Sequence, residues 1–273
     1  MIRFITLTCN RPDFIELQFN SIRNHVHEEF SYEVFDSSNG NDEIFDVCKT
    51  LNVTHHKIPV ICQDKHDPSR CCGFHLNQLW KSLGDYKGII FFIDSDMFLI
   101  KDINILSMMQ NFDMSFIPVR KPSFFYAWPN LVIVDAKKVD ITKFDWTVTD
   151  SPEGRLDTGG SNWSFFKNSN LNIQFFDDHF LHDDNAYHYC GNDYIGEVID
   201  NNHANYEKLN AMVKDIFPKP YYYDMITMCK SSFEEAFVLH YKSGSNYQPF
   251  ATEEYNRLKT IGLRVLLKQF GSI

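Results

Sequence analysis

The segment that most restricts the fold is a run of six uncharged residues from Gly88 to Ile93, which two aspartates follow, Asp94 and Asp96. A strand without polar alternation is typical of a parallel sheet that is covered on both faces. Because residues i and i+2 of an extended segment project to the same side, the two carboxylates should converge where the strand ends. Ligands of open α/β sheets bind outside the carboxyl ends of the strands. The segment therefore predicts a central strand that leads into a ligand site.

Strand and helix patterns alternate before this segment, which favours a parallel sheet with crossover helices. The pattern is less regular afterwards, and we expect one domain with an elaborated C-terminal half. The expected strands are Ile2–Thr8, Tyr32–Phe35, Val53–Ile58, Met114–Val119, Leu131–Val134 and Ala236–Tyr241. One expected helix begins at Pro12, and the others span Ile44–Leu51, Cys71–Leu83 and Thr252–Phe270. The fold class is therefore α/β: a Rossmann-like, mostly parallel twisted sheet with flanking helices, in a single domain.

Charge and cysteine usage exclude several classes of protein. The 273 residues carry a formal net charge of −10, which argues against nucleic-acid partners and against a polybasic membrane anchor. The seven cysteines form no C-x-x-C pair, so we expect neither a zinc ribbon nor a disulfide framework. No stretch approaches the roughly 20 apolar residues of a membrane-spanning helix. We therefore expect a reduced, cytoplasmic protein without a transmembrane segment.

The two aspartates and one distant histidine have the chemistry of a metal site. Two close carboxylates repel each other unless one is protonated or a hard cation lies between them. His240 follows an apolar run, and an imidazole ligand beside Asp94 and Asp96 would favour Mn²⁺ over Mg²⁺. The alternatives are that one aspartate caps a helix while the other is solvated, and that His240 is a hydrogen-bonded core residue.

Three segments of the first hundred residues are FITLTCNRPDF, EVFDSSN and GFHLNQLWKSLGDYKGIIFFIDSD. Together they resemble the GT-A-fold glycosyltransferases, in which a D-x-D motif holds a divalent metal on the diphosphate of a nucleotide-sugar. The resemblance implies that the first segment borders the nucleotide base and that the acid ending the second faces it. Ser95 would touch the ribose, and an arginine would pair with phosphate. The donor-binding residues expected on this basis are Thr8, Asn10, Arg11, Asp36, Arg70, Asn77, Asp94 and Ser95.

Three downstream segments resemble the same family. LDTGGSNW is similar to the loop that approaches the donor sugar, and LHDDNAYHY is similar to the acidic motif near the reacting carbon. VLHYKSGSNY resembles the C-terminal motif in which a histidine, here His240, is a third metal ligand. Asp183, Asp184 and Asp157 are therefore the catalytic candidates, and the resemblance favours a retaining mechanism. The further donor-binding candidates are Lys242, Gly244 and Ser245. The alternative for the Asp183–Asp184 pair is a helix N-terminus or a solvated loop.

These features predict a metal-dependent hexosyl or related sugar transferase. The resemblance implies a nucleotide-sugar donor, with UDP as the commonest nucleotide of the resembled fold, and a glycan or glycoconjugate acceptor. Residues 1–100 would form the nucleotide-binding half, 101–250 the acceptor and catalytic half, and 251–273 a C-terminal helix.

Three alternatives compete with the prediction of a sugar transferase. One is a nucleotidyltransferase of similar fold, and another is a non-catalytic sugar-binding module. The third is an iron- and 2-oxoglutarate-dependent oxygenase, in which His182, Asp184 and His240 would hold iron in a jelly-roll fold.

Overall fold

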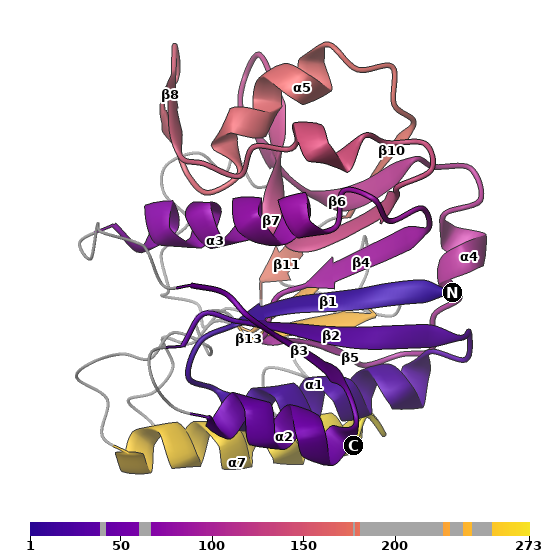
Figure 1. Ribbon diagram of the computed structural model, residues 1–273, viewed down its shortest axis with the longest axis vertical. Helices are drawn as coiled ribbons and strands as arrows, with labels where there is room; N and C mark the ends of the chain where they lie inside the picture. The colour runs from indigo at the N-terminus through magenta and orange to yellow at the C-terminus, as the bar shows by residue number, and fades with distance from the viewer. Residues whose placement is uncertain (39–41, 60–66, 177, 181–225, 230–236, 242–252) are drawn as a thin grey trace, which may run out of the picture. The chain divides into compact units, whose positions relative to one another are not determined.

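The computed structural model describes residues 1–38, 42–59, 67–176, 178–180, 226–229, 237–241 and 253–273 (Figure 1). The chain forms two compact units. Unit 1 comprises Met1–Thr8, Glu28–Asp94 and Ile105–Phe176, and unit 2 comprises Cys9–His27, Ser95–Asn104 and Asp177–Ile273. The boundary between Asp94 and Ser95 falls inside the D-x-D motif.

Unit 1 is built on a seven-stranded sheet with the order β10-β6-β7-β4-β1-β2-β3. Its strands are β1 (Ile2–Thr8), β2 (Phe30–Asp36), β3 (Thr54–Lys57), β4 (Ile89–Ile93), β6 (Met114–Arg120), β7 (Phe125–Asp135) and β10 (Ile173–Phe175). β7 pairs antiparallel with β4 and β6, and every other pairing in this sheet is parallel. Helices flank the sheet, so the predicted α/β class with a mostly parallel sheet is confirmed.

The central strands of unit 1 are buried as the sequence predicts. Ile90, Phe91 and Ile93 of β4 have no exposed surface, and the ring of Phe91 stacks on that of Phe4 at 4.7 Å. The connecting elements are α2 (Glu43–Leu51), α3 (Pro68–Ser82), α4 (Ile105–Met108), η1 (Ile141–Lys143), β8 (Thr149–Ser151), β9 (Gly154–Leu156), η2 (Gly160–Asn162) and α5 (Trp163–Lys167). Apolar residues of α3 and of the sheet share one large core.

β7 begins six residues earlier than the sequence pattern predicts, at Phe125 and not at Leu131. The aromatic residues before Leu131 pair with β6, with a register shift between Phe116 and Pro118. Phe125 packs against the rings of Phe166 and Phe175 at 5.9 and 5.0 Å. Aromatic side chains fit a pleated, half-buried surface, which explains why this segment continues the strand.

Unit 2 combines a second sheet with two helices. Its elements are α1 (Pro12–His25), β5 (Met97–Leu99), β11 (Asp178–Phe180), β12 (Ile226–Cys229), β13 (Val238–Tyr241) and α7 (Glu253–Gln269). The four strands pair antiparallel in the order β11-β12-β13-β5. Apolar side chains of α1, β5, β13 and α7 form a common core. The predicted C-terminal helix therefore packs on α1.

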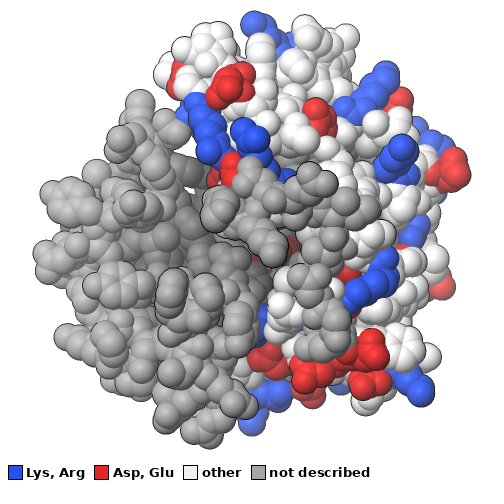
Figure 2. Space-filling model, turned by 60° about the vertical axis from the view of Figure 1, so that its left-hand side comes forward, with Lys and Arg blue, Asp and Glu red and all other residues white. Residues whose placement is uncertain are grey.

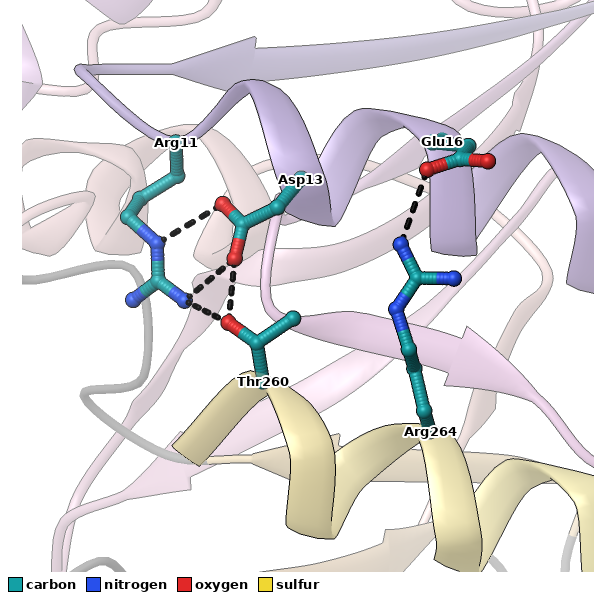
Figure 3. Close-up of polar contacts among 5 residues, drawn as sticks. All are labelled: Arg11, Asp13, Glu16, Thr260 and Arg264. Atoms are coloured by element: carbon teal, nitrogen blue, oxygen red, sulfur yellow. Dashed lines mark hydrogen bonds and ion pairs between the residues drawn. The ribbon is translucent and has the colours of Figure 1, made fainter. Parts of the chain in front are cut away.

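Polar contacts also join α1 to α7 (Figure 3). Arg11 forms a two-point ion pair with Asp13, at 3.1 and 3.0 Å, and Thr260 of α7 donates a hydrogen bond to the same carboxylate. Arg264 of α7 binds Glu16 at 2.9 Å. Although burial raises the pKa of Asp13, its bonds with Arg11 and Thr260 outweigh burial and lower that pKa. Asp13 is therefore ionised at neutral pH and fixes the start of α1 against α7.

The cysteines depart in one respect from the expected reduced state. Cys71 is disulfide-bonded, whereas the buried Cys48 is a free thiol. Burial and the nearby Asp36 raise the pKa of the Cys48 thiol to about 12, so this cysteine is a neutral core residue. In the described part of the chain, no helix has the length and apolar content needed to cross a membrane.

Candidate functional site

Asp94 lies at the carboxyl end of the central strand β4, as predicted. Its amide donates a hydrogen bond of 2.8 Å to the carbonyl of Asn130, which extends the β4–β7 pairing by one residue. The side chain is half-buried. The order β3-β2-β1-β4 means that the chain first builds the sheet to one side of β1 and then crosses to the other. Such a reversal is where ligands bind in open α/β sheets, so Asp94 stands at the expected ligand edge of unit 1.

Thr8 ends β1, the strand next to β4, and is also at this edge. Its side chain is 2% exposed, and its hydroxyl has no hydrogen-bond partner among the residues that the structure describes. A buried hydroxyl without a partner costs about 1–3 kcal/mol, so a partner from elsewhere would be stabilising. The position and the state of Thr8 are consistent with its predicted role in donor binding.

In unit 2 the structure brings together two of the three predicted metal ligands, Asp96 and His240. β5 pairs with β13 so that Met97 faces His240, and the Tyr241 amide donates to the Asp96 carbonyl at 2.8 Å. This register places Oδ1 of Asp96 3.4 Å from Nε2 of His240. The two residues are 2% and 1% exposed. The pairing of two strands therefore creates a buried carboxylate–imidazole pair.

The pair offers one oxygen and one nitrogen ligand, which is a donor set that Mn²⁺ accepts. Within the described residues, no group of three or more His, Cys, Asp or Glu side chains is arranged to hold a metal ion. Asp96 and His240 therefore fit a metal site that other ligands would complete. The metal itself, and the part of Asp94 in holding it, stay predictions.

Asp36, predicted to face the nucleotide base, is bound by its own sheet. Its carboxylate accepts hydrogen bonds from Lys57 at 2.7 Å and from the Ser38 amide at 2.7 Å, and His55 lies 3.2 Å away. Burial alone raises the pKa of Asp36, but the bonds from Lys57 and Ser38 outweigh it and hold that pKa below its usual value. Asp36 thus joins β2 to β3, and contact with a base stays a prediction.

The lowered pKa of Asp36 predicts a pH dependence of stability. A depressed pKa in the folded state contributes stability that is present above the unfolded pKa of about 3.9 and is lost as pH falls through the folded pKa. We expect Asp36→Asn to lower the free energy of unfolding by about 1–2 kcal/mol at pH 7, where charged hydrogen bonds are lost, and by less near pH 3. Urea unfolding at both pH values measures this. The exposed Asp85→Asn serves as control, and an equal loss at both pH values would contradict the assignment.

Two predicted residues of α3 have structural partners. Asn77 accepts a hydrogen bond from the Trp146 amide at 2.8 Å and donates one to Asp145 at 3.1 Å. Arg70 lies 3.1 Å from Asp67, the residue that caps α3. Asn77 therefore anchors the segment around Trp146. The sequence pattern did not reveal this role of Asn77.

Arg11 and Asn10, expected at the donor, occupy the turn before α1. Asn10 has a φ of 56°, a left-handed conformation that asparagine tolerates. Arg11 is 3% exposed, and its guanidinium lies 3.6 Å from the centre of the Phe14 ring in addition to the ion pair in Figure 3. Ser95 is 1% exposed. Local structure accounts for Asn10 and Arg11, and the predicted contacts of all three with the donor stay predictions.

The glycine-bearing loop also has a packing role. Gly159 has a φ of +86°, and a Cβ there would lie 2.6 Å from the carbonyl of Ala127. At Gly160 a Cβ would lie 2.4 Å from that of Leu156. Asp157 is exposed and accepts the amide hydrogen of Thr158 at 2.7 Å. The glycines are thus required by packing, while Asp157 remains accessible as a catalytic candidate.

The other predicted residues lie outside the described part of the chain: His182, Asp183, Asp184, Lys242, Gly244 and Ser245.

Unit 1 has two surface hollows, and none of the predicted site residues lines either of them. One, of about 500 Å³, is lined by residues including Lys143 and Phe165, and the other, of about 230 Å³, by residues including His56 and Gln78. Figure 2 shows acidic and basic side chains close together on the described part of one face. Arg70 and Arg155 both contact Asp67. Neither hollow includes Thr8, Asp94, Asp96 or His240, so neither carries the functional assignment.

Comparison with family models and with curated proteins finds no match. Solved structures with partial similarity include the galactosyltransferase LgtC in complex with donor and acceptor sugar analogues. Its TM-score is 0.39 and its identity 12%, over 63% of this chain and 72% of that chain. The bifunctional glycosyltransferase WbbM has a TM-score of 0.35 and 11% identity, over 50% of this chain and 32% of that chain. For residues 1–349 of S. aureus TarS the TM-score is 0.30 and the identity is 17%, over 44% of this chain and 35% of that chain. Each similarity is partial, so the function is inferred from the chain's own residues.

Proposed function

We propose that this protein is a glycosyltransferase that moves a sugar from a nucleotide-diphosphate sugar to a glycan or other hydroxyl acceptor, with UDP as the first nucleotide to test. The observation that carries the proposal is the buried Asp96–His240 pair of unit 2, whose side chains lie 3.4 Å apart. In the sequence, Asp96 comes two residues after Asp94, which follows strand β4 of the mostly parallel sheet. A strand-end aspartate, a second aspartate two residues later and a distant histidine are the ligands that the sequence predicts for a diphosphate-bound cation.

The residues of the chain have distinct roles in this proposal. Asp94, Asp96 and His240 would hold Mn²⁺ or Mg²⁺, and such an ion stabilises the negative charge that develops on a departing nucleoside diphosphate. Thr8 would bind the donor from the end of β1. Asp183 or Asp184 would act at the reacting carbon, with Asp157 as a further candidate. We favour retention, in which such a carboxylate stabilises or transiently bonds to the oxocarbenium-like carbon.

The fold separates this proposal from the oxygenase alternative. That alternative requires a jelly roll of antiparallel strands, whereas unit 1 has a mostly parallel sheet with crossover helices. The nucleotidyltransferase and sugar-binding alternatives are tested by identifying the product that the protein releases from a nucleotide-sugar. A nucleotidyltransferase releases pyrophosphate and a glycosyltransferase releases a nucleoside diphosphate, while a binding module releases neither.

A thermal-shift screen of nucleoside diphosphates, each with and without Mn²⁺, tests the proposal. A ligand at 100 times its Kd adds about 2.7 kcal/mol of stability, and each kcal/mol raises Tm by about 2–4 °C for a chain near this size. We expect a rise of about 5–10 °C with one nucleotide and Mn²⁺ together, and a much smaller rise with either alone. Asp85→Asn should respond as the wild type does. Absence of any metal-dependent response to a nucleotide would refute the proposal.

A further inference from the structure

Among the described residues, β5 is held along both of its edges, by a strand on one side and by side chains of a helix on the other. On one side it pairs with β13. On the other side two side chains of α1 take the place of a strand: Gln18 Nε2 donates to the Met97 carbonyl at 2.8 Å, and the Leu99 amide donates to Ser21 Oγ at 3.1 Å. Residues i and i+2 of a strand direct their backbone groups to the same edge, which explains this pair of contacts.

Gln18 and Ser21 are polar residues in the buried face of an amphipathic helix. Both have no exposed surface, although they lie among apolar residues of α1 such as Leu17 and Ile22. The Ser21 hydroxyl also donates to the Gln18 carbonyl at 2.8 Å. Buried polar groups are retained only where they are hydrogen-bonded, and here they satisfy backbone groups of β5 that would otherwise be buried without partners.

These contacts lie directly beside Asp96. The Asp96 carbonyl accepts from Tyr241 on the β13 side, and the next carbonyl, that of Met97, accepts from Gln18 on the α1 side. The backbone that carries the Asp96 carboxylate is therefore held from both sides. A slip or rotation of β5 relative to β13 would change the 3.4 Å separation of Asp96 and His240.

We propose that Gln18 and Ser21 are positioning residues that hold the Asp96 carboxylate in register with His240. The inference deepens the proposed function, on which it rests, because it assigns to α1 the geometry of the metal ligands. Outer residues that orient metal ligands typically change metal affinity by 10–100-fold when they are replaced.

Three substitutions isolate the effect. Gln18→Met keeps the length and flexibility of the side chain but removes the donor, and Ser21→Ala removes the hydroxyl. Ser21→Thr keeps a hydroxyl at this position and should bind Mn²⁺ more tightly than Ser21→Ala does. Leu263→Ala is the control, since it removes buried volume from α7 in the same core but leaves the hydrogen bonds from Gln18 and Ser21 to β5 in place.

Two measurements separate failure of this inference from failure of the proposed function. The first is the Kd of Mn²⁺ in the presence of the best nucleoside diphosphate, followed by electron paramagnetic resonance of free Mn²⁺. We expect Gln18→Met and Ser21→Ala to weaken Mn²⁺ at least about 10-fold, in the range for such residues, and Leu263→Ala to change it less than 2-fold. If Leu263→Ala weakens Mn²⁺ as much as they do, general destabilisation explains the effect and the inference is wrong.

The second measurement needs no metal. The ¹⁵N chemical shifts of the His240 ring, recorded at one pH in the metal-free protein, should change in Gln18→Met and remain at wild-type values in Leu263→Ala. If the wild type binds no Mn²⁺–nucleotide, the proposed function fails while these shifts still test the positioning. Unchanged His240 shifts in both Gln18→Met and Ser21→Ala would overturn the inference.

Discussion

Asp96→Asn is expected to lower kcat/KM for sugar transfer by at least about 100–1,000-fold, the range found when one electrostatic contact to a developing charge is removed. The substitution keeps the size of the side chain but takes away the negative charge next to His240. An amide is a poor ligand for Mn²⁺ compared with a carboxylate, and metal-dependent nucleotide binding should therefore fail together with activity. Release of nucleoside diphosphate from the best donor, measured over a range of Mn²⁺ concentrations, gives the effect.

Two comparisons make this result specific. Asp85→Asn removes an exposed carboxylate of unit 1 and should retain wild-type activity. His240→Gln should resemble Asp96→Asn in its loss of metal dependence, because the two side chains are proposed to hold one ion. The Tm of each variant without ligand shows whether the fold is retained. Full Mn²⁺-dependent activity in Asp96→Asn would remove this residue from the site.

Phe116→Ala is expected to cost about 3–5 kcal/mol of unfolding free energy, the usual range for a deleted buried phenylalanine. Phe116 has no exposed surface, and its ring lies 4.9 Å from that of Phe166 and 5.5 Å from that of Phe175. The substitution opens a cavity where β6, α5 and β10 meet. Such a loss is a large part of the 5–15 kcal/mol that stabilises an ordinary protein.

Urea unfolding followed by circular dichroism measures this loss. The exposed Phe45, with 47% of its surface accessible, provides a matched control, and Phe45→Ala should cost less than about 1 kcal/mol. A small effect of Phe116→Ala would mean that these rings do not form a packed core.

Periodicity was sufficient to predict most of the regular structure, because apolar spacing records which side of an element is buried. It located β4 and the aspartate at its end, and it located α7. It missed the start of β7, since an aromatic run with a proline does not show a clear two-residue alternation. It also could not show that β7 runs antiparallel to β4 and β6, because pairing direction depends on the path of the chain between strands.

The candidate site was less predictable from the residues alone. The Asp96–His240 contact was expected through resemblance to a family, and no local pattern relates two positions so far apart. The partners of Arg11 were not predicted, because Thr260 lies on a helix far along the chain from Asp13 and Arg11. The phosphate role of Arg11 stays a prediction. Gln18 is a sequence signal for the contact of α1 with β5, since a glutamine inside an apolar helical stripe needs a buried partner.

The β5–β13 pairing has a consequence for how the protein is made. Asp96 and His240 are separated by 144 positions, so the strand that carries Asp96 is synthesised long before its partner. At about 5–20 residues per second, β5 waits about 7–29 s on the ribosome before β13 exists. Over this interval α1 is already present, and its Gln18 and Ser21 can occupy one edge of β5. The helix would then shield that edge of the nascent strand from pairing with other chains until β13 is made and pairs with the other edge.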